Sequence, residues 1–207
     1  QAIDYAIKKG NKVAIVSTKT CDLLINRVNV NAYSCIAGAE TLFENRSCLD
    51  LNLIKYQDDV ISLINFIKND KEIIKSKAKI EVKKTSSNLI AGINIDWRFS
   101  SKPNLDSIID YAKKLNFKVI TYENEPFIDI LIIKLNKGDA LLFLKKLFNA
   151  DLTIYFGDSE NDLPAFEKAD IPILVLHKYN NHLKNINVKE VVEFYKVWEA
   201  IIKYADY

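Results

Sequence analysis

The stretch Tyr155–Phe166, YFGDSENDLPAF, decides how the rest of the sequence is interpreted. Its apolar start is typical of a buried strand, and it turns at Gly157 before placing two carboxylates, Asp158 and Asp162, four positions apart. Two carboxylates on one tight turn repel each other unless a cation lies between them, and carboxylate and water oxygens suit Mg²⁺. The structural alternative is that both aspartates only stabilise the start of the next helix.

Short apolar runs alternate with helical patterns on either side of this stretch. Apolar runs at 12–18 and 171–176 also predict buried parallel strands. Helical spacing of apolar residues is found at 2–10, 21–28, 137–148, 163–169 and 188–205. Strands and helices that alternate in this way predict an α/β fold with a Rossmann-like parallel sheet.

The pattern changes between residues 79 and 133. A long amphipathic helix is expected at 58–75, followed by strands at 79–85 and 88–97, a helix at 104–117, and strands at 118–124 and 127–134. This arrangement predicts an α+β unit with a sheet of its own. We therefore expect a core domain formed by residues 1–44 and 131–207, interrupted by an inserted domain at 45–130.

The composition argues against several classes of function. The 207 residues are 49% hydrophobic and include 29 basic and 27 acidic side chains, which gives a formal net charge of +2. Because positive and negative charges nearly balance, the composition does not indicate nucleic acid or an anionic membrane as the partner. A transmembrane helix needs about twenty consecutive apolar residues, and no apolar run of the sequence is that long. The sequence also has no signal-peptide pattern. We therefore expect a soluble, cytoplasmic protein.

Two further polar clusters lie where a predicted strand ends or a predicted helix begins. They are STKT at Ser17–Thr20 and NKGD at Asn136–Asp139. Ligands of open α/β sheets bind beyond the carboxyl ends of the strands. A hydroxyl with backbone N–H groups can bind phosphate, and a lysine offers a positive charge to a phosphoryl oxygen. The clusters indicate phosphate chemistry, with a helix cap at Ser17 and a surface position for Lys137 as the structural alternatives.

The three clusters, in this order, resemble motifs II, III and IV of the haloacid dehalogenase (HAD) superfamily of phosphohydrolases. In this resemblance Ser17 is the motif II hydroxyl, Lys137 is the motif III lysine, and Asp158 and Asp162 are the acidic pair of motif IV that holds Mg²⁺. Asp162 is either a direct ligand or a neighbour of the direct ligands. The resemblance also implies roles in phosphate binding or positioning for three residues beside these motifs: Thr18, Gly157 and Asn161.

The inserted domain resembles the α/β cap, of the C2 type, that some relatives carry between motifs II and III. STKT and GDSENDLPAFE are most similar to mannosyl-3-phosphoglycerate phosphatases, while IEVKK and the short cap are more similar to trehalose-6-phosphate phosphatases. In the latter, a Glu-x-Lys of the cap meets the sugar, and Glu81 and Lys83 match it. Arg98 is a further candidate for substrate binding. The alternative for all three is an exposed charge on the cap.

The family also needs motif I, DxDGT, whose first aspartate is the nucleophile and whose second is the general acid/base. No stretch of the chain matches it, and NID at Asn94–Asp96 is not followed by Gly-Thr. In the family, motif I lies on a strand between those that end at Ser17 and Asp158, and without it both neighbours would expose backbone groups to a buried gap. We therefore expect an N-terminal segment of roughly 15 to 30 residues before Gln1.

The resemblance implies a Mg²⁺-dependent phosphomonoester hydrolase. It would act on a small phosphorylated sugar or sugar acid of the mannosyl-3-phosphoglycerate or trehalose-6-phosphate type through an aspartyl-phosphate intermediate. A phosphoglycolate-type phosphatase, and a non-catalytic phosphate-binding protein that lacks the nucleophile, are the alternatives. The expected partner is the small phosphorylated substrate, and the chain is expected to be a monomer or a homodimer.

The remaining conspicuous side chains are expected to be structural. His177 and His182 are expected in a surface loop, because two histidines without ligand spacing do not indicate a metal site. Three cysteines without a CxxC pair indicate neither a disulfide framework nor a zinc site. Buried positions are expected for five residues: Cys21, Cys35, Cys48, Tyr195 and Trp198.

Overall fold

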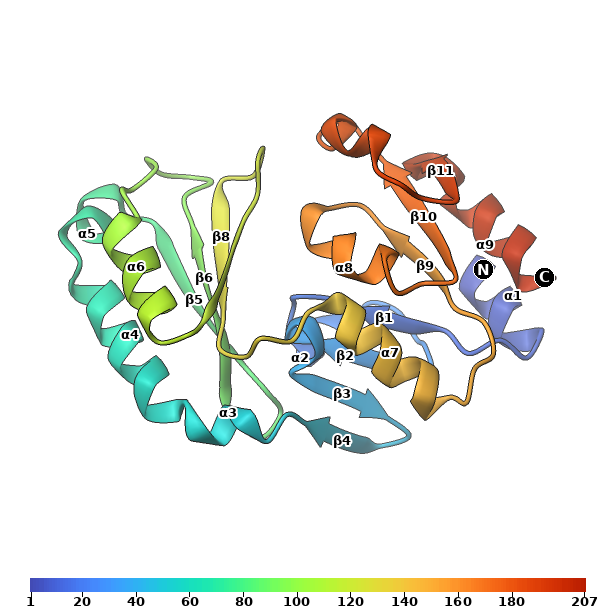
Figure 1. Ribbon diagram of the computed structural model, residues 1–207, viewed down its shortest axis with the longest axis horizontal. Coiled ribbons are helices and arrows are strands. Elements are labelled where there is room, and N and C mark those ends of the chain that lie inside the picture. Colours follow the sequence, from blue (N-terminus) through green and yellow to red (C-terminus); the bar gives the residue numbers. More distant parts are fainter.

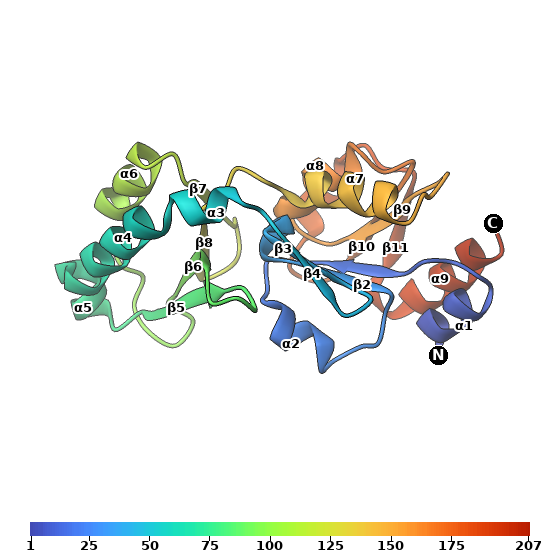
Figure 2. The same ribbon diagram turned by 90° about the horizontal axis from the view of Figure 1, so that it is seen from below.

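The computed structural model describes residues 1–207 as two lobes (Figure 1). One lobe, called the core below, comprises residues 1–50 and 132–207, and the other, called the cap, comprises residues 51–131. Figure 2 shows the lobes side by side, joined where the chain enters and leaves the cap. This layout is the expected one, an α/β core interrupted by an α+β insertion.

The strands of the core form two sheets. The first has the order β1-β2-β3-β4, with strands at Ala14–Val16, Ala32–Cys35, Glu40–Phe43 and Arg46–Leu49. In it β1 and β2 are parallel, whereas β3 and β4 add antiparallel pairs. The second sheet has the order β11-β10-β9, is parallel throughout, and has strands at Glu190–Glu193, Ile171–Leu176 and Ile154–Gly157.

The helices of the core flank these sheets. They are α1 (Ala2–Lys8), α2 (Cys21–Ile25), α7 (Lys137–Leu147), α8 (Leu163–Phe166) and α9 (Val197–Ala205), with short 3₁₀ helices at Ile36–Gly38, Glu160–Asp162, Asn181–Asn185 and Phe194–Lys196. α1 and α9 lie side by side and bring the two ends of the chain together (Figure 1). None of the helices combines the length and the apolar character that a membrane span requires.

The core sheet is divided between β1 and β9. Each of these strands hydrogen-bonds to a neighbour on one side only, β1 to β2 and β9 to β10. Side chains from both strands line the same cavity, which is described below. The single parallel sheet expected from the sequence is therefore present as two parts that face each other across an open space.

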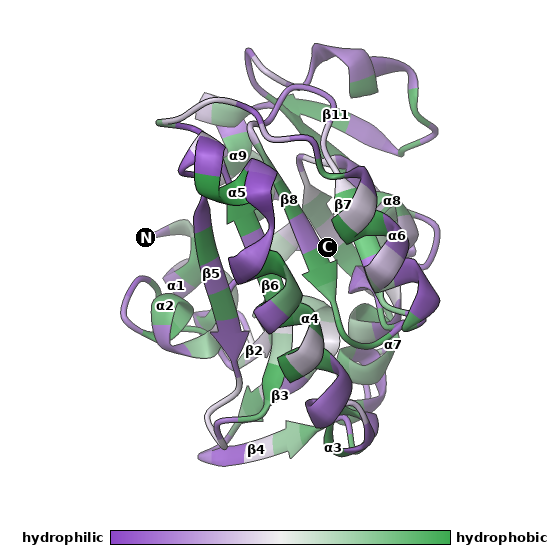
Figure 3. Ribbon diagram, turned by 90° about the vertical axis from the view of Figure 1, so that its left-hand side faces the viewer, coloured by the Kyte–Doolittle hydropathy of each residue, from purple (hydrophilic) through white to green (hydrophobic).

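The cap has an antiparallel sheet covered by helices on one face. Its strands are β5 (Lys79–Lys84), β6 (Ile90–Asp96), β7 (Lys118–Thr121) and β8 (Phe127–Leu131), in the order β5-β6-β8-β7. Its helices are α3 (Asn52–Lys55), α4 (Gln57–Asn69), α5 (Lys71–Ser76) and α6 (Asp106–Lys114). Viewed from the cap side, α4, α5 and α6 lie in front of the sheet (Figure 3). The other face of the sheet is thereby left for the core.

Some of the expected boundaries differ from the structure. Arg46–Leu49 pairs with β3 in the core sheet, so the inserted domain begins a few residues after position 45. The helix expected at 58–75 is interrupted at Asp70, whose side chain accepts hydrogen bonds from two N–H groups of the next turn and caps α5. The helix expected at 188–205 begins with β11, which pairs with β10. Tyr195 and Trp198 are not buried, since they are 69% and 55% exposed.

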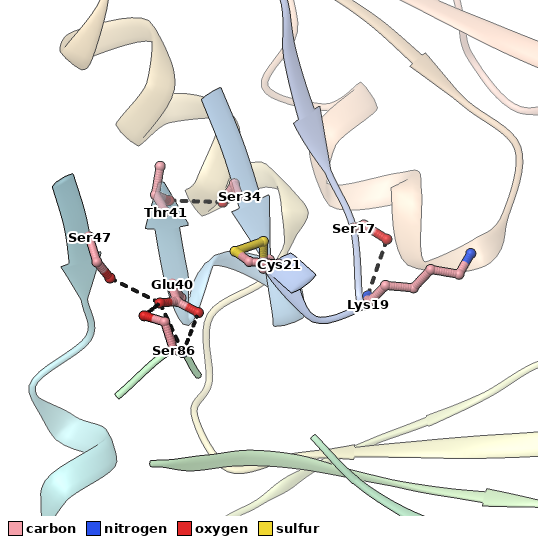
Figure 4. The surroundings of a disulfide bond; sticks show 9 residues. Ser17, Lys19, Cys21, Ser34, Glu40, Thr41, Ser47 and Ser86 are labelled. Carbon is pink, nitrogen blue, oxygen red and sulfur yellow. Dashed lines mark hydrogen bonds between the residues drawn. A yellow bond between two sulfur atoms is a disulfide. The ribbon is translucent and has the colours of Figure 1, made fainter. Parts of the chain in front are cut away.

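The cysteines also differ from expectation. Cys21 and Cys35 form a disulfide with a Cα–Cα distance of 5.4 Å (Figure 4), and Cys48 is free and exposed. The bond joins the first residue of α2 to the last residue of β2, which are 14 positions apart. No sequence signature marks this pair, because the fold alone brings the two residues together. The expectations of no disulfide and of a buried Cys48 were therefore wrong.

Candidate functional site

A cavity of about 830 Å³ lies between the core and the cap. Its walls come from β1, β9 and the start of α7 in the core, and from β5, β6 and β8 in the cap. It is lined by all ten residues that the sequence singled out: Ser17, Thr18, Glu81, Lys83, Arg98, Lys137, Gly157, Asp158, Asn161 and Asp162. The fold brings these residues into one place, and their roles in chemistry remain predictions.

Asp162 is the most constrained carboxylate of the site. Its Oδ1 accepts hydrogen bonds from Lys137 Nζ and from the Tyr155 hydroxyl, both at 2.6 Å. Its Oδ2 accepts the N–H groups of Asp158 and Ser159 at 3.0 Å and the Ser159 hydroxyl at 2.9 Å. Burial alone would raise the pKa of Asp162, but the charge of Lys137 and these hydrogen bonds hold the pKa below its usual value. Both oxygens are occupied, so a metal ion would have to displace one of these donors.

Gly157 allows this packing at the end of β9. A Cβ at position 157 would lie 2.6 Å from Cβ of Asp162 and 2.8 Å from the ring of Phe166. Any other residue would push the buried carboxylate away from the strand end. Glycine at position 157 is therefore required by the close approach of Asp162 and Phe166.

Lys137 reaches the cavity because NKGD forms a capping box. The Asn136 side chain accepts from the N–H groups of Gly138 and Asp139, and the Asp139 carboxylate accepts from the N–H of Asn136. A Cβ at Gly138 would lie 2.3 Å from the carbonyl oxygen of Pro164, so α7 begins in close contact with α8. This start fixes Lys137 in a buried position, not on the surface.

The STKT loop follows β1 and leaves one hydroxyl proton free. The Ser17 Oγ accepts the N–H of Lys19 at 3.1 Å, an arrangement that leaves the Ser17 O–H able to donate into the cavity. Thr20 precedes α2 but its side chain makes no capping hydrogen bond. The disulfide at Cys21 ties the end of this loop to β2. The loop can therefore present a hydroxyl and backbone groups to an oxyanion.

Asp158 is the open carboxylate of the site. Its side chain is 57% exposed, and its Oδ2 lies 3.5 Å from Nε2 of His177. Its main-chain carbonyl accepts from Asn180 Nδ2 at 2.7 Å, which holds the strand end. A single open carboxylate beside a roomy cavity fits Mg²⁺, which takes few protein ligands and keeps several waters.

The three cap residues differ in how free they are. Lys83 is buried, forms an ion pair with Asp129 at 2.5 Å, and donates to the carbonyl oxygen of Thr18 at 3.0 Å. Arg98 is half exposed and lies 3.4 Å from Asp96. Glu81 makes no side-chain hydrogen bond or ion pair. Glu81 and Arg98 are thus available to a ligand, whereas Lys83 links the cap to the core.

The sequence did not point to several residues that line the cavity. Tyr122 donates to Asp129 at 2.9 Å and accepts from Asn161 at 3.0 Å, and burial together with the charge of Asp129 raises the pKa of its hydroxyl. His177 and His182 also line the cavity and are not merely surface loop residues. The strand-end rule, applied to the end of β10 at Leu176, would have found His177. Nothing in the sequence marks Tyr122 or Asp129.

A second group of possible metal ligands lies at the rim of the cavity. Ligand atoms of Glu123, Glu160 and His182 all lie within 4.8 Å of one another. His182 Nε2 is 2.9 Å from the Glu160 carboxylate and 3.9 Å from that of Glu123. Glu123 belongs to the cap and the other two residues to the core, so this group spans the two lobes.

Several known proteins are similar to this chain in sequence or in fold. A glucosyl-3-phosphoglycerate/mannosyl-3-phosphoglycerate phosphatase of Persephonella marina is 22% identical over 221 aligned positions, and the alignment covers 90% of this chain and 80% of that protein. A solved trehalose-6-phosphate phosphatase related protein superposes with a TM-score of 0.72 at 13% identity, over 99% of this chain and 85% of that one. A solved HAD subclass IIB sugar phosphatase superposes with a TM-score of 0.65 at 13% identity, over 98% and 89% of the two chains.

The family follows from a separate comparison. Residues 71–186, more than half of the chain, match the family model of haloacid dehalogenase-like hydrolases. This segment contains both Lys137 and the GDSEND turn, and the solved structures above share the fold of nearly the whole chain. The chain belongs to the haloacid dehalogenase-like hydrolase family.

Proposed function

We propose that this protein is a Mg²⁺-dependent phosphomonoester hydrolase that acts on a small phosphorylated sugar or sugar acid. The observation that carries the proposal is the convergence of Ser17, Lys137 and Asp158 on one cavity between the core and the cap. These residues offer a hydroxyl donor, a cation and an open carboxylate, the groups that a phosphoryl group and its counter-ion require. The phosphatase that matches the chain over most of its length supports the same reaction class.

The chain's own residues would bind and orient the phosphoryl group. The Ser17 hydroxyl and the backbone of Thr18 would contact phosphoryl oxygens, and Lys137 would neutralise the negative charge that develops on them. Asp162 would hold Lys137 in place, since the two groups are 2.6 Å apart in a buried pair. Asn161 would help to keep the turn between Asp158 and Asp162 in shape.

Asp158 would supply the protein's carboxylate ligand to Mg²⁺. When bound, the metal would offset charge on the phosphoryl oxygens and align the groups that react. Asp162 would support this site by accepting the N–H groups of Asp158 and Ser159, either as a direct ligand or as a neighbour of the direct ligands.

The nucleophile would come from a strand that fills the space between β1 and β9. No carboxylate of residues 1–207 lies on either strand at that space, and both strands are open on that side. A carboxylate at the end of such a strand would attack phosphorus and form the aspartyl-phosphate. A second, protonated carboxyl group would give its proton to the leaving alkoxide as the bond between phosphorus and that oxygen breaks. The carboxylate so formed would then take a proton from the water that hydrolyses the aspartyl-phosphate.

The cap would contact the rest of the substrate. Most of the cap residues that face the cavity are polar, and they carry charges of both signs; they include Glu81, Asn94, Asp96 and Arg98. Hydroxyl groups of a sugar can both donate to carboxylates and accept from Arg and Asn, so such a surface suits a polyhydroxylated ligand. A sugar phosphate is favoured over phosphoglycolate because a two-carbon acid has too few hydroxyl groups to engage these polar side chains.

The test is release of inorganic phosphate by the protein expressed from its complete reading frame. We expect activity on trehalose-6-phosphate, mannosyl-3-phosphoglycerate or a related sugar phosphate, lost with EDTA and restored with Mg²⁺. Lys137→Ala and Asp158→Ala should each lower kcat/KM at least a hundredfold. Lys145→Ala, which changes a partly exposed lysine of the same helix, should not. Unchanged activity in either site variant would refute the assignment.

The same experiment separates the rival function. A non-catalytic phosphate-binding protein would bind sugar phosphates in calorimetry, with binding weakened by Lys137→Ala, and would release no phosphate. A cytoplasmic location and a monomeric or dimeric state are further predictions. The Cys21–Cys35 disulfide bears on the first, because reducing compartments keep such thiols reduced. Thiol labelling of protein taken directly from cells would test it.

A further inference from the structure

A chain of polar contacts leads from the STKT loop into the cap. It begins at the carbonyl oxygen of Thr18, which accepts from Lys83 Nζ at 3.0 Å. Lys83 Nζ also bonds to Oδ1 of Asp129 at 2.5 Å, and Oδ2 of Asp129 accepts the hydroxyl of Tyr122 at 2.9 Å. These contacts connect a loop of the core with β5, with β8 and with the residue that follows β7.

The chain of contacts returns to the core at the GDSEND turn. Asn161 Nδ2 donates to the Tyr122 hydroxyl at 3.0 Å, and Ser159 Oγ lies 2.7 Å from Oδ1 of Asn161 and 2.9 Å from Oδ2 of Asp162. A hydroxyl has one proton, so Ser159 can serve only one of these two acceptors at a time. Asn161 and Asp162 therefore compete for the same Ser159 proton, so a movement of Asn161 changes the hydrogen bond that Asp162 receives.

The last contact in this series reaches the ammonium group of Lys137. Asp162 holds Lys137 Nζ at 2.6 Å, so the series runs from one phosphate-binding element to another by way of the cap. Lys83, Asp129, Lys137 and Asp162 are all buried. In such surroundings each hydrogen bond is stronger than in water, and the loss of one member leaves its partners unsatisfied.

Tyr122 is the point at which this series crosses from the cap to the turn. Its hydroxyl both donates to Asp129 and accepts from Asn161, so it uses one proton and one lone pair to join the two lobes. Its neighbours in the chain add weaker contacts to the core, such as Asn124 Nδ2 with the carbonyl oxygen of Tyr179 at 3.4 Å. A movement of the cap away from the core would break the Tyr122–Asn161 contact.

We propose that Tyr122 is a positioning residue that couples closure of the cap to the geometry of the GDSEND turn, and through it to Lys137. The structural coupling does not depend on the phosphatase function proposed above, but its expected effect on turnover does. With the cap closed, Tyr122 holds Asn161, and Ser159 and Asp162 keep the arrangement that fixes Lys137. With the cap open, the turn loses this support. A substrate that engages the cap therefore favours the competent form of the site.

The first test needs no catalysis. Amide hydrogen exchange is measured on wild type and on Tyr122→Phe, and the amides of residues 158–162 should exchange about tenfold faster in the variant, the equivalent of one lost hydrogen bond. Tyr111→Phe is the matched control, because its ring packs edge-on against Phe66 in the cap and its hydroxyl makes no hydrogen bond. Equal exchange at 158–162 in wild type and Tyr122→Phe would overturn the proposal.

The second test is kinetic. For a sugar phosphate, Tyr122→Phe should lower kcat about tenfold and change KM less than twofold. For a small aryl phosphate that does not fill the cap, the variant should stay within twofold of wild type. An equal loss on both substrates would indicate a general structural role and overturn the coupling. A wild type that releases no phosphate while exchange at 158–162 rises as expected would instead contradict the phosphatase and leave the coupling standing.

Discussion

At the scale of single residues, the site depends on the buried ion pair between Lys137 and Asp162. The sequence motifs predicted both residues but not that they pair with each other. The side chains of Lys137 and Asp162 are 9% and 2% exposed and 2.6 Å apart. Removing one partner from such a pair leaves an uncompensated buried charge, whereas removing both does not. The pair should therefore show strong non-additivity, which an exposed pair of the same chain should lack.

We expect Lys137→Met to lower the free energy of unfolding by about 3 kcal/mol, the low end of the usual range, because Asp162 keeps its other donors. Adding Asp162→Asn should recover part of this loss, since the neutral amide has a smaller desolvation cost. Lys145→Met removes the ion pair with Asp170, whose side chains are 29% and 38% exposed, and should cost about 1 kcal/mol or less. Urea unfolding measures all three variants, and equal losses for the two lysines would contradict the expected difference.

The residues that the sequence found share a local signal, and those it missed do not. Ser17, Lys137 and Asp158 lie at strand ends or a helix start within short polar motifs. Tyr122 and Asp129 have no such motif, and they meet the site only because the cap folds back onto the core. Cross-lobe partners of this kind are a property of the tertiary structure, and periodicity and spacing do not reveal them.

At the scale of elements, the disulfide is the feature that holds the STKT loop against the sheet. It fixes the start of α2 to the end of β2, next to the turn at Ile36–Gly38 that begins with residues at positive φ. Figure 4 shows the bond beside Ser17 and Lys19. A cross-link across 14 positions restricts the unfolded chain and thereby stabilises the folded one.

We expect reduction of this disulfide to lower the free energy of unfolding by about 3 kcal/mol, as the loop-entropy relation gives for a loop of this length. Urea unfolding with and without dithiothreitol measures the difference. Cys48→Ser is the control, since Cys48 is free and exposed and its replacement should leave both curves unchanged. Superimposable curves for oxidised and reduced protein would show that the bond contributes nothing to stability.

Most elements could be predicted because their patterns are local. The apolar runs at β9 and β10 and the helical spacing at α7 are visible in the sequence and match the structure closely. The spacing of apolar residues at 188–205 predicts a helix throughout, but Glu190–Glu193 forms β11 by pairing with β10. The break between α4 and α5 depends on Asp70 acting as a cap in a continuous helical pattern. Strand pairing and side-chain capping decide these two elements, and the periodicity of apolar residues reveals neither.

At the scale of the whole molecule, the open space between β1 and β9 is the unusual feature. Successive main-chain groups of a strand point to opposite sides, and Ser17 N–H donates to Ser34 in the direction of β2. The main-chain groups of Ala14 and Val16 therefore point away from β2, toward the space that β9 borders. Thr153 likewise accepts from Ile171 on the β10 side, so Ile154 and Phe156 direct their main-chain groups the other way.

Unpaired strand edges should leave a measurable trace in a protein of residues 1–207. We expect the amides of Val16 and Phe156 to exchange at least a hundredfold faster than those of Ile173 and Leu174, which lie on β10 between two partners. A strand that fills the space would pair with both edges and slow the exchange of Val16 and Phe156 to the level of β10. Strong protection of these two amides in residues 1–207 alone would contradict an open space, and with it the proposal that this space receives the strand carrying the nucleophile.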